Sequence, residues 1–518
     1  MAKADIKVLV DWNNDGNYTH AQSDITDDVI NVSWSRGRNY ASQLSGNSVA
    51  GNLSATLYNT SGKYSPDNTS SPITGKIEPA LRVKIVGGTE SSFPYTFPIV
   101  FTDTNPLWTG RLEEIRPEPS AKGTKRARLR GIGVLGYLND FKVDLATQTS
   151  ARTDQAIGAI LDDAGWGGGD RELATGITTM TRFWLDSKNT MNALRIPEET
   201  EGGFIKETKD GKIAFESRHT RLSGDYLTSQ ATFSDAGGSA LSFTKIEQID
   251  PLSTIVNHAQ ATSRSYTVAG SATVLWTLGE TGSESPTLAP NETRIFEARY
   301  PNPDSGNNAV EVNAWTTPAS TTDYTANTAS DGSGTDLTSS LGVTNTKVAE
   351  RMIITIINNH ASSSAYLTKL QARGTAVTQK QNTVRSIDTS SQAKYGERKF
   401  VAETQFIPNT TEAQKWCEFQ LSIYSTPVNI LKMGIVAGAS TSMLVEALTL
   451  DISNRITVTA NNESELGVNA DFFIESEKHA IRGGNHTVTY ALSPASGGYS
   501  QFWVLAVSKL GQNTVPAY

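Results

Sequence analysis

A short acidic stretch near the start of the chain has residue types that could bind a metal ion. Asp11, Asn13 and Asp15 stand at alternate positions before a glycine, as oxygen ligands do at the start of a calcium loop. The twelfth position of such a loop holds a bidentate glutamate, whereas here it is Gln22, with Asp24 nearby. An Asn-Asp-Gly turn requires the same residue types for backbone reasons alone. We therefore predict a turn, and we keep calcium at Asp11, Asn13, Asp15 and Asp24 as the alternative; no other cofactor is expected.

Exposed tryptophans could stack on sugar rings. Three of the nine tryptophans lie outside the obvious core strands, namely Trp166, Trp276 and Trp315. Aromatic residues of β-sandwiches belong more often to the core, so glycan stacking is the alternative interpretation.

The residues that usually carry catalysis do not form a recognisable set. None of the six histidines has the close spacing of a metal motif such as H-E-x-x-H. Cys417, the only cysteine, lies on the apolar stripe of a predicted helix, which favours a buried and inert thiol. Adjacent carboxylates such as Glu113 and Glu114 point to opposite faces of a strand, so they cannot flank one glycosidic bond. We predict that the chain is not an enzyme.

The charge of the chain argues against a nucleic-acid-binding protein. The net charge is −8, and phosphate binding requires concentrated Lys and Arg. One basic run is interleaved with apolar residues, as on a strand with one solvated face; it contains Lys122, Lys125, Arg126, Arg128 and Arg130. We expect no stable nucleic-acid binding. The opening residues lack the apolar region of a signal peptide, and no run reaches membrane-spanning length, so we expect synthesis in a cytoplasm and no membrane span.

Composition and periodicity predict a mainly β fold with a small α+β part. Thr, Ser, Asn and Gly are abundant, and period-two alternation recurs at both ends of the chain. A length of 518 residues is too great for one ordinary core. We predict four domains: a tube-like β-barrel over 1–140, a small α+β domain over 141–255, an inserted β-sandwich over 256–377, and a second β-barrel with one packed helix over 378–518.

Four local signals are strong enough to place elements. The apolar spacing from Thr153 predicts a helix that Gly165 ends, and a second helix is expected from Asn189 until Pro197 stops it. Asp210-Gly211 between two apolar runs predicts a hairpin. A third helix is expected after residue 410, with Thr411 and Gln414 as its capping box.

The order of several motifs resembles that of hub proteins in the tail tip or baseplate of long-tailed phages, also called minor tail proteins. An Asp/Asn/Gly turn is followed by a strand ending in arginine and by a Tyr-Ser-Pro element, and later motifs follow in the same order. These motifs lie at residues 11–16, 29–38, 62–72, 107–110, 204–218 and 473–492.

This resemblance implies a structural role in the virion. Three copies would form a ring that continues the tail tube, and an insertion would decorate its outside. The implied partners are other copies of the chain, the distal tail protein or tail tube, the tape-measure protein, and tail fibre or receptor-binding proteins. The implied mechanism is mechanical, with a lumen that opens for DNA ejection, and a net acidic chain suits a lumen that repels DNA.

Two other classes of function compete with this interpretation. A carbohydrate-binding adhesin is favoured by the Ser/Thr/Asn-rich segment 256–377 and by the tryptophans named above. A tail-associated peptidoglycan hydrolase lacks a recognisable nucleophile, metal set or acid/base pair.

Overall fold

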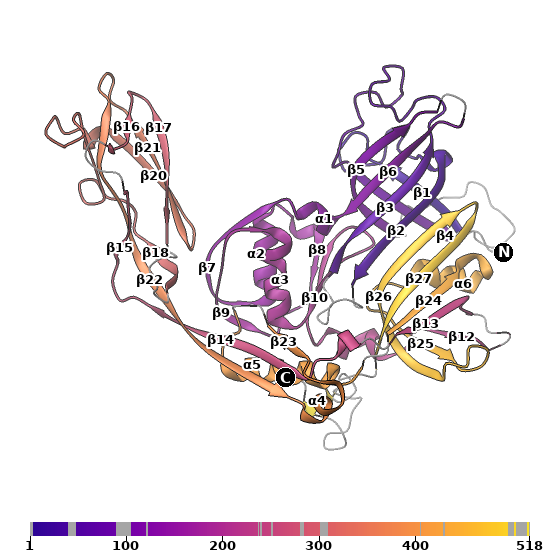
Figure 1. The fold of residues 1–518 in the computed structure, drawn as a ribbon. Helices are drawn as coiled ribbons and strands as arrows, with labels where there is room; N and C mark the ends of the chain where they lie inside the picture. The colour runs from indigo at the N-terminus through magenta and orange to yellow at the C-terminus, as the bar shows by residue number, and fades with distance from the viewer. Residues whose placement is uncertain are drawn as a thin grey trace.

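The structure is mainly β, as the sequence predicts. It is a computed structural model that describes residues 4–516 apart from 40–47, 90–104, 121–122, 237, 239–240, 250–251, 280–283, 301–308, 403, 405, 428–429, 496–501 and 504–514. Figure 1 shows a large sheet on one side, helices in the middle and a projecting arm on the other side. None of its helices is long and apolar enough to cross a membrane, as far as the described residues go.

Strands from the two ends of the chain form one twelve-stranded sheet. Ten of them follow the order β1-β4-β5-β6-β3-β2-β26-β27-β24-β13, while β25 pairs with β26 and β12. Their bounds are β1 (Ala4–Val10), β2 (Val29–Arg38), β3 (Ser48–Tyr58), β4 (Arg82–Thr89), β5 (Pro106–Glu118), β6 (Arg126–Gly133), β12 (Ala231–Ser234), β13 (Lys245–Ile249), β24 (Ile430–Val436), β25 (Arg455–Ala460), β26 (Val468–Arg482) and β27 (Asn485–Pro494).

This continuity differs from the two separate barrels expected from the sequence. One hydrophobic core runs from Val8 to Leu492 and holds residues of both ends of the chain. Within the described residues the pairing path has two ends, β1 and β13, and does not close on itself. Period-two alternation shows that a strand has one apolar face, but it carries no information about which strands become neighbours. Closure into tubes and the domain limits therefore stay predictions.

The helical part lies between the large sheet and the arm (Figure 1). Its elements are α1 (Val134–Leu138), β7 (Lys142–Arg152), α2 (Thr153–Asp163), β8 (Arg171–Leu173), β9 (Thr179–Asn189), α3 (Thr190–Glu201), β10 (Phe204–Glu207) and β11 (Ile213–Glu216). The helix from Thr153 and the hairpin around Asp210-Gly211 are confirmed.

The prediction that Pro197 ends α3 is wrong. Pro197 is buried inside the helix, which continues to Glu201. The helix ends because Gly202 adopts a positive φ of 69° and its N–H reaches the carbonyls of Glu198 and Glu199. Burial of the proline and of the following turn compensates for the backbone hydrogen bond that proline cannot make.

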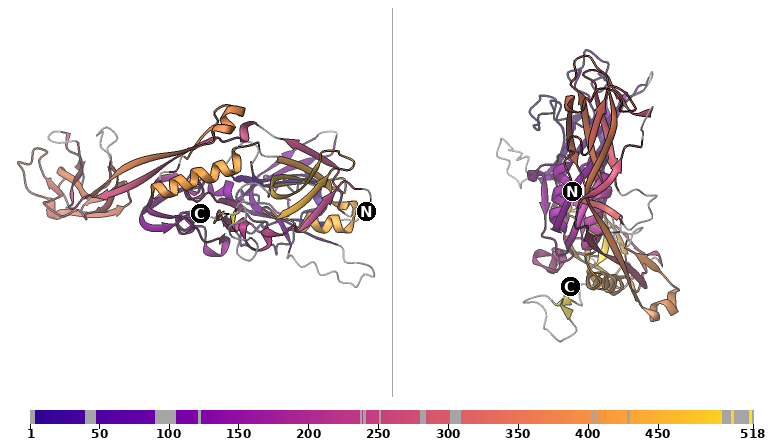
Figure 2. Two further views of the ribbon diagram at one scale, coloured as in Figure 1. Left: turned by 90° about the horizontal axis from the view of Figure 1, so that it is seen from below. Right: turned by 90° about the vertical axis from the view of Figure 1, so that its left-hand side faces the viewer.

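The arm is built on two long paired strands, β14 and β22, which carry further strands at their outer end (Figures 1 and 2). The helix α5 lies along this ribbon (Figure 2, left), and its N-cap is Asn409, whose side chain accepts from Glu412 N–H. The capping box predicted at Thr411 is therefore wrong, because Gln414 bonds Ser386 and Glu418 instead. The remaining elements are β14 (His258–Val268), β15 (Thr273–Thr277), β16 (Thr287–Leu288), β17 (Thr293–Arg299), β18 (Ala309–Trp315), β19 (Tyr324–Asn327), β20 (Leu341–Lys347), β21 (Arg351–Asn358), β22 (Ala365–Ile387), α4 (Thr389–Tyr395), β23 (Lys399–Val401), α5 (Thr410–Tyr424), α6 (Thr441–Thr449), β28 (Phe502–Trp503) and β29 (Val515–Pro516).

Candidate functional site

The two halves of the large sheet meet where β2 pairs with β26. The register runs antiparallel from Asn31 opposite Arg482 to Gly37 opposite Ser476. Gly37 has a φ of +123°, and a Cβ atom there would lie 2.4 Å from the carbonyl oxygen of Glu475. Only glycine allows this approach, so the β2–β26 seam depends on one residue without a side chain.

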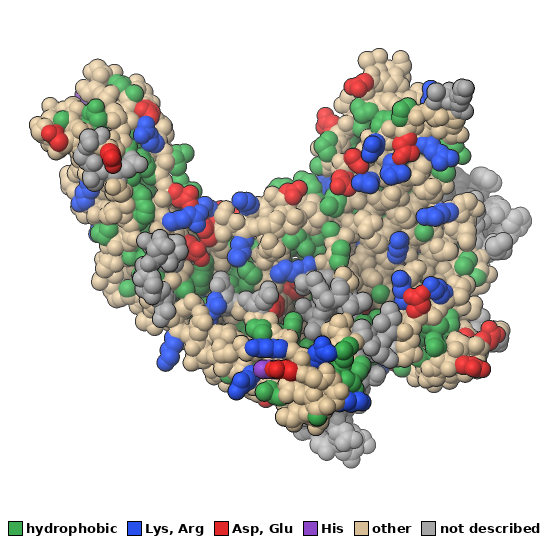
Figure 3. Space-filling view, viewed as in Figure 1, with side chains coloured by type: hydrophobic (Ala, Val, Ile, Leu, Met, Phe, Trp, Pro, Cys, Tyr) green, Lys and Arg blue, Asp and Glu red, His purple; other side chains and the backbone are tan. Residues whose placement is uncertain are grey.

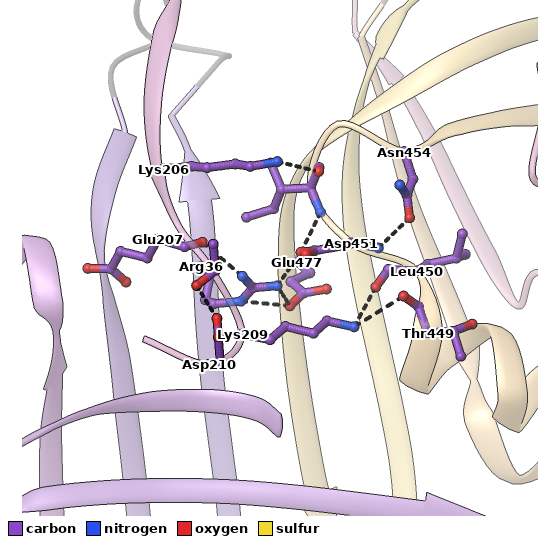
Figure 4. A network of polar contacts seen from close by, with 12 residues as sticks. Arg36, Lys206, Glu207, Lys209, Asp210, Thr449, Leu450, Asp451, Asn454 and Glu477 are labelled. Atoms are coloured by element: carbon purple, nitrogen blue, oxygen red, sulfur yellow. Dashed lines mark hydrogen bonds and ion pairs between the residues drawn. The ribbon is translucent and has the colours of Figure 1, made fainter. Parts of the chain in front are cut away.

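Arg36 is the centre of a buried charge network beside the seam (Figure 4). Its Nη2 lies 2.6 Å from Oε1 of Glu477 and 2.5 Å from Oδ1 of Asp451, and its Nη1 donates to the backbone oxygen of Glu207 at 2.9 Å. The Arg36 side chain is 1% exposed. One guanidinium thus joins β2, β26, the loop after α6 and the hairpin β10–β11.

The charges of this network hold one another in the ionised state. Burial by itself would raise the pKa of Glu477, but Arg36 and Lys209 overcome that effect and lower it. The pKa of Asp451 is lowered in the same way. Burial would lower the pKa of Arg36, yet the two carboxylates raise it. A buried pair of this kind is costly to break, because removal of one partner leaves an uncompensated charge.

The hairpin β10–β11 contributes two lysines to the same junction. Lys206 Nζ lies 2.5 Å from Glu216 Oε1 and donates to the carbonyl of Ile452 at 2.9 Å. Lys209 Nζ donates to the carbonyls of Leu448 and Leu450, at 2.9 and 2.7 Å. These carbonyls belong to the last turn of α6 and the residue after it, where a cation also complements the helix dipole. Figure 4 shows both lysines reaching from the hairpin towards the C-terminal part of the chain.

Glu207 connects the hairpin to the N-terminal half of the sheet. Its carboxylate accepts from the N–H of Leu135 at 2.7 Å and from the N–H of Gly51 at 3.0 Å. Burial raises the pKa of Glu207 to about 7, although both backbone donors oppose the shift. The hairpin β10–β11 therefore forms hydrogen bonds with the start of α1 and strand β3, and also with the C-terminal half of the chain.

A second buried charge group lies next to the first, further along the seam. Glu475 receives Arg221 at 2.6 Å and Arg38 at 2.8 Å, and Ser493 Oγ donates to it at 2.5 Å. Burial alone would raise the pKa of Glu475, but the two arginines lower it to about 2. Both guanidinium groups also lie over the Phe204 ring, at 4.2 and 4.5 Å.

The carboxylates at the centre of the network are paired, and the cysteine is buried. The carboxylates of Glu475, Glu477 and Asp451 each face a cation, so none is poised as a free acid or base. Cys417 is buried, and burial raises the pKa of its thiol to about 11, which disfavours a nucleophilic thiolate. The described residues contain no group of three or more His, Cys, Asp or Glu side chains that could hold a metal ion.

In the structure, each of the four residues proposed to bind calcium accepts hydrogen bonds from other groups of the protein. Asp11 is buried and accepts from Gly16 N–H at 2.8 Å, Asn13 accepts from Lys76 Nζ at 2.7 Å, and Asp24 accepts from Thr26. Asp15 accepts from Asn17 N–H at 2.9 Å. These hydrogen bonds are typical of a turn stabilised by its own side chains, so they favour the turn over a calcium site. Calcium binding stays a prediction.

The three tryptophans of the glycan hypothesis do not share a surface. Trp166 and Trp315 are 9% and 6% exposed, and their indole N–H groups donate to the carbonyls of Asp170 and Val348. Only Trp276 is half-buried, at the outer end of the arm. Glycan stacking therefore depends on Trp276 alone and stays a prediction.

Sequence reasoning did not identify the charge network, although it singled out some of the segments that form it. The motif strand 29–38 supplies Arg36 and Arg38, the motif 204–218 supplies Lys206, Glu207 and Glu216, and the motif 473–492 supplies Glu475 and Glu477. The available signal was the recurrence of charged residues within these motifs. That signal does not say which charge meets which.

The fold defined by this joined sheet, the helical part and the arm is that of a phage tail protein, which confirms the predicted resemblance at the level of the fold. The structure is similar to the tail protein from Neisseria meningitidis MC58, with a TM-score of 0.50 and 10% identity, over 96% of this chain and 98% of that chain. It is also similar to the 43 kDa tail protein of prophage MuSo2 from Shewanella oneidensis, with a TM-score of 0.48 and 8% identity, over 94% and 97% of the two chains. No protein-family model and no curated protein matches the sequence.

Proposed function

We propose that this protein is a structural hub of a phage tail tip. Three copies form a ring that extends the tail tube, connects it to tip or fibre proteins, and leaves a lumen through which DNA is ejected. The observation that carries the proposal is the similarity to the Neisseria tail protein, which extends over nearly the full length of both chains.

The charge network is consistent with a role in which the protein must withstand force. A hub must keep its N- and C-terminal strands together while the tail changes state, and the Arg36 and Glu475 groups resist separation because each buried charge would lose its partner. The partners that fit this role are further copies of the chain, the tail tube or distal tail protein, the tape-measure protein, and fibre or receptor-binding proteins.

The test combines mass in solution with position in the particle. Sedimentation of the purified protein should give a species of three times the 55.8 kDa chain. Electron cryomicroscopy of intact particles should show the chain at the tip of the tail, in a ring around a central hole. A chain that stays monomeric at every concentration and is absent from the tail would refute the proposal.

A second candidate function, glycan binding, is favoured by the position of Trp276. The arm projects from the body (Figure 1) and carries exposed apolar side chains, including Ile295 at 66% exposure and Val274 at 47%. A glycan array probed with the full chain and with Trp276→Ala tests it. Binding lost in the variant would support an adhesin, whereas equal signals from both proteins would exclude stacking on Trp276.

A further inference from the structure

The outer surface of the large sheet is polar and positively charged. It is made by the residues that alternate with the core residues on eight neighbouring strands, β5, β6, β3, β2, β26, β27, β24 and β13; we call it the open face. Its side chains are mostly small and hydroxylic, as in Ser33, Ser54, Thr487 and Thr489. Figure 3 shows Lys and Arg side chains distributed over this side of the sheet.

The balance of charge on the open face is opposite to that of the whole chain. Its cations are Arg111, Arg116, Arg126, Arg128, Arg130, Lys245, Lys432, Lys478 and Arg482, and its carboxylates are Glu113, Glu114, Glu118, Glu247 and Asp471. Nine cations against five carboxylates give the face +4, so with −8 for the whole chain the remainder amounts to −12. Positive charge is therefore concentrated on one face, although the chain as a whole is acidic. The concentration arises because strands from distant parts of the sequence pair in one sheet.

The cations are spread across the strands in register. Arg128 lies opposite Thr56, which lies opposite Asn31, and Asn31 lies opposite Arg482. Lys478 faces Thr489, and Lys432 lies one strand further, opposite Ala491. From β6 to β24 the sheet takes five strand steps, which is about 24 Å and exceeds the width of about 12 Å of the major groove of DNA. A duplex on this face could therefore present both phosphate rows beside a groove to cations.

The carboxylates on the face neutralise it only weakly. Arg128 pairs with Glu118 at 3.2 Å and Arg130 with Glu114 at 3.6 Å, and all four side chains are between 42% and 52% exposed. Exposed pairs of this kind contribute little, so a phosphate can replace the carboxylate at small cost. Arg116, Arg126, Lys478 and Arg482 form no ion pair within the described part of the chain.

We propose that the open face is a contact surface for the phosphate backbone of double-stranded DNA, weak and independent of sequence. The proposal rests on the proposed hub function, because a tail conduit is what would bring DNA to this face. It differs from the acidic, repelling surface that the net charge suggests. An acidic protein partner is less favoured, because stable protein interfaces centre on aromatic and apolar side chains, and Tyr58 is the one large aromatic among the exposed residues described on these strands.

The test measures binding of the full-length chain to a short fluorescent DNA duplex as a function of salt. If all four net charges meet phosphates, log K should fall with log salt with a slope of about −3.6, which is a loss of about 150-fold between about 50 and 200 mM salt. The variant Arg128→Gln/Lys432→Gln/Lys478→Gln should reduce the slope to about −0.9 and the loss to about 3.5-fold. The control Lys380→Gln/Lys394→Gln/Lys399→Gln removes the same charge from exposed sites near the arm and should bind as the wild type does.

Each alternative has its own result. No binding of the duplex at low salt, or equal losses in both triple variants, would overturn the open face as the DNA surface. Equal binding of poly-L-glutamate would assign the face to an acidic protein and would also overturn the proposal. If the open-face variant failed to form trimers while the control variant formed them, the face would be an interface between copies. The hub function itself is judged separately, by the trimer and by its place in the tail, so the two proposals can fail independently.

Discussion

Acid should weaken the sheet through a buried histidine pair beside the seam. His486 is 5% exposed, its Nε2 lies 3.0 Å from Nδ1 of His479, and Trp34 stacks on His479 with ring centroids 4.7 Å apart. Burial, and to a lesser extent His479, lowers the pKa of His486 from 6.5 to about 3. The native protein therefore keeps this imidazole neutral at a pH where the unfolded chain is already protonated.

The sign and size of the effect follow from proton linkage. Because the folded pKa lies below the unfolded one, the stability that neutral His486 provides is present above pH 6.5 and is lost as the pH falls towards 3. At pH 5 the unfolded group lies 1.5 pH units below its pKa, which costs about 2 kcal/mol at about 1.36 kcal/mol per unit. His486→Gln removes this titration and should reduce the loss of stability on acidification by that amount.

The assay is urea denaturation of wild type and His486→Gln at about pH 7.5 and pH 5, followed by tryptophan fluorescence. The variant should be less stable at pH 7.5, because it loses the contact with His479, but its free energy of unfolding should depend less on pH. His360→Gln, which replaces a histidine on the arm, controls for the loss of an imidazole. If His486→Gln lost as much stability as the wild type between the two pH values, the reasoning would be refuted.

Four further perturbations test the architecture. Arg36→Met should lower the free energy of unfolding by about 3–5 kcal/mol, since it removes the guanidinium that bonds both Glu477 and Asp451. Arg36→Met/Glu477→Gln should recover part of the loss in the same denaturation assay; an additive double variant would contradict the pairing. Gly37→Ala should lower the melting temperature because its Cβ would meet the Glu475 carbonyl, whereas Gly88→Ala, with nothing within 4 Å, should change it little. Asp11→Ala should destabilise the turn at residues 11–16 by about 1 kcal/mol, and millimolar calcium should leave the wild-type melting temperature unchanged; a calcium-dependent rise would instead establish the ion. Arg351→Gln should speed hydrogen exchange in β7 and β9, because Arg351 joins the arm to Asp144 and Asp186 at 2.6 and 3.1 Å; unchanged exchange would show that these pairs do not hold the arm.

Local signals in the sequence were sufficient for the mainly β class and for individual elements. The stripe from Thr153 and the turn at Asp210-Gly211 were found because periodicity and turn chemistry depend on neighbours only a few residues apart. The wrong predictions at Pro197 and at Thr411 also rested on local signals. The burial of α3 allowed the helix to continue through Pro197, and Asn409, not Thr411, caps α5.

What the sequence by itself determined was the mainly β class and the residues that share a face on each alternating strand. Alternation in β26 shows that Glu477 and His479 lie on one side, but not that this side is the interior, where polar residues are least expected. Only the tertiary structure decided this, because the compensating charges come from far away in the chain: Arg36 is separated from Glu477 by 441 positions. Burial of charge is stable only when such partners converge, and their convergence is set by the pairing of β2 with β26, which no local pattern encodes.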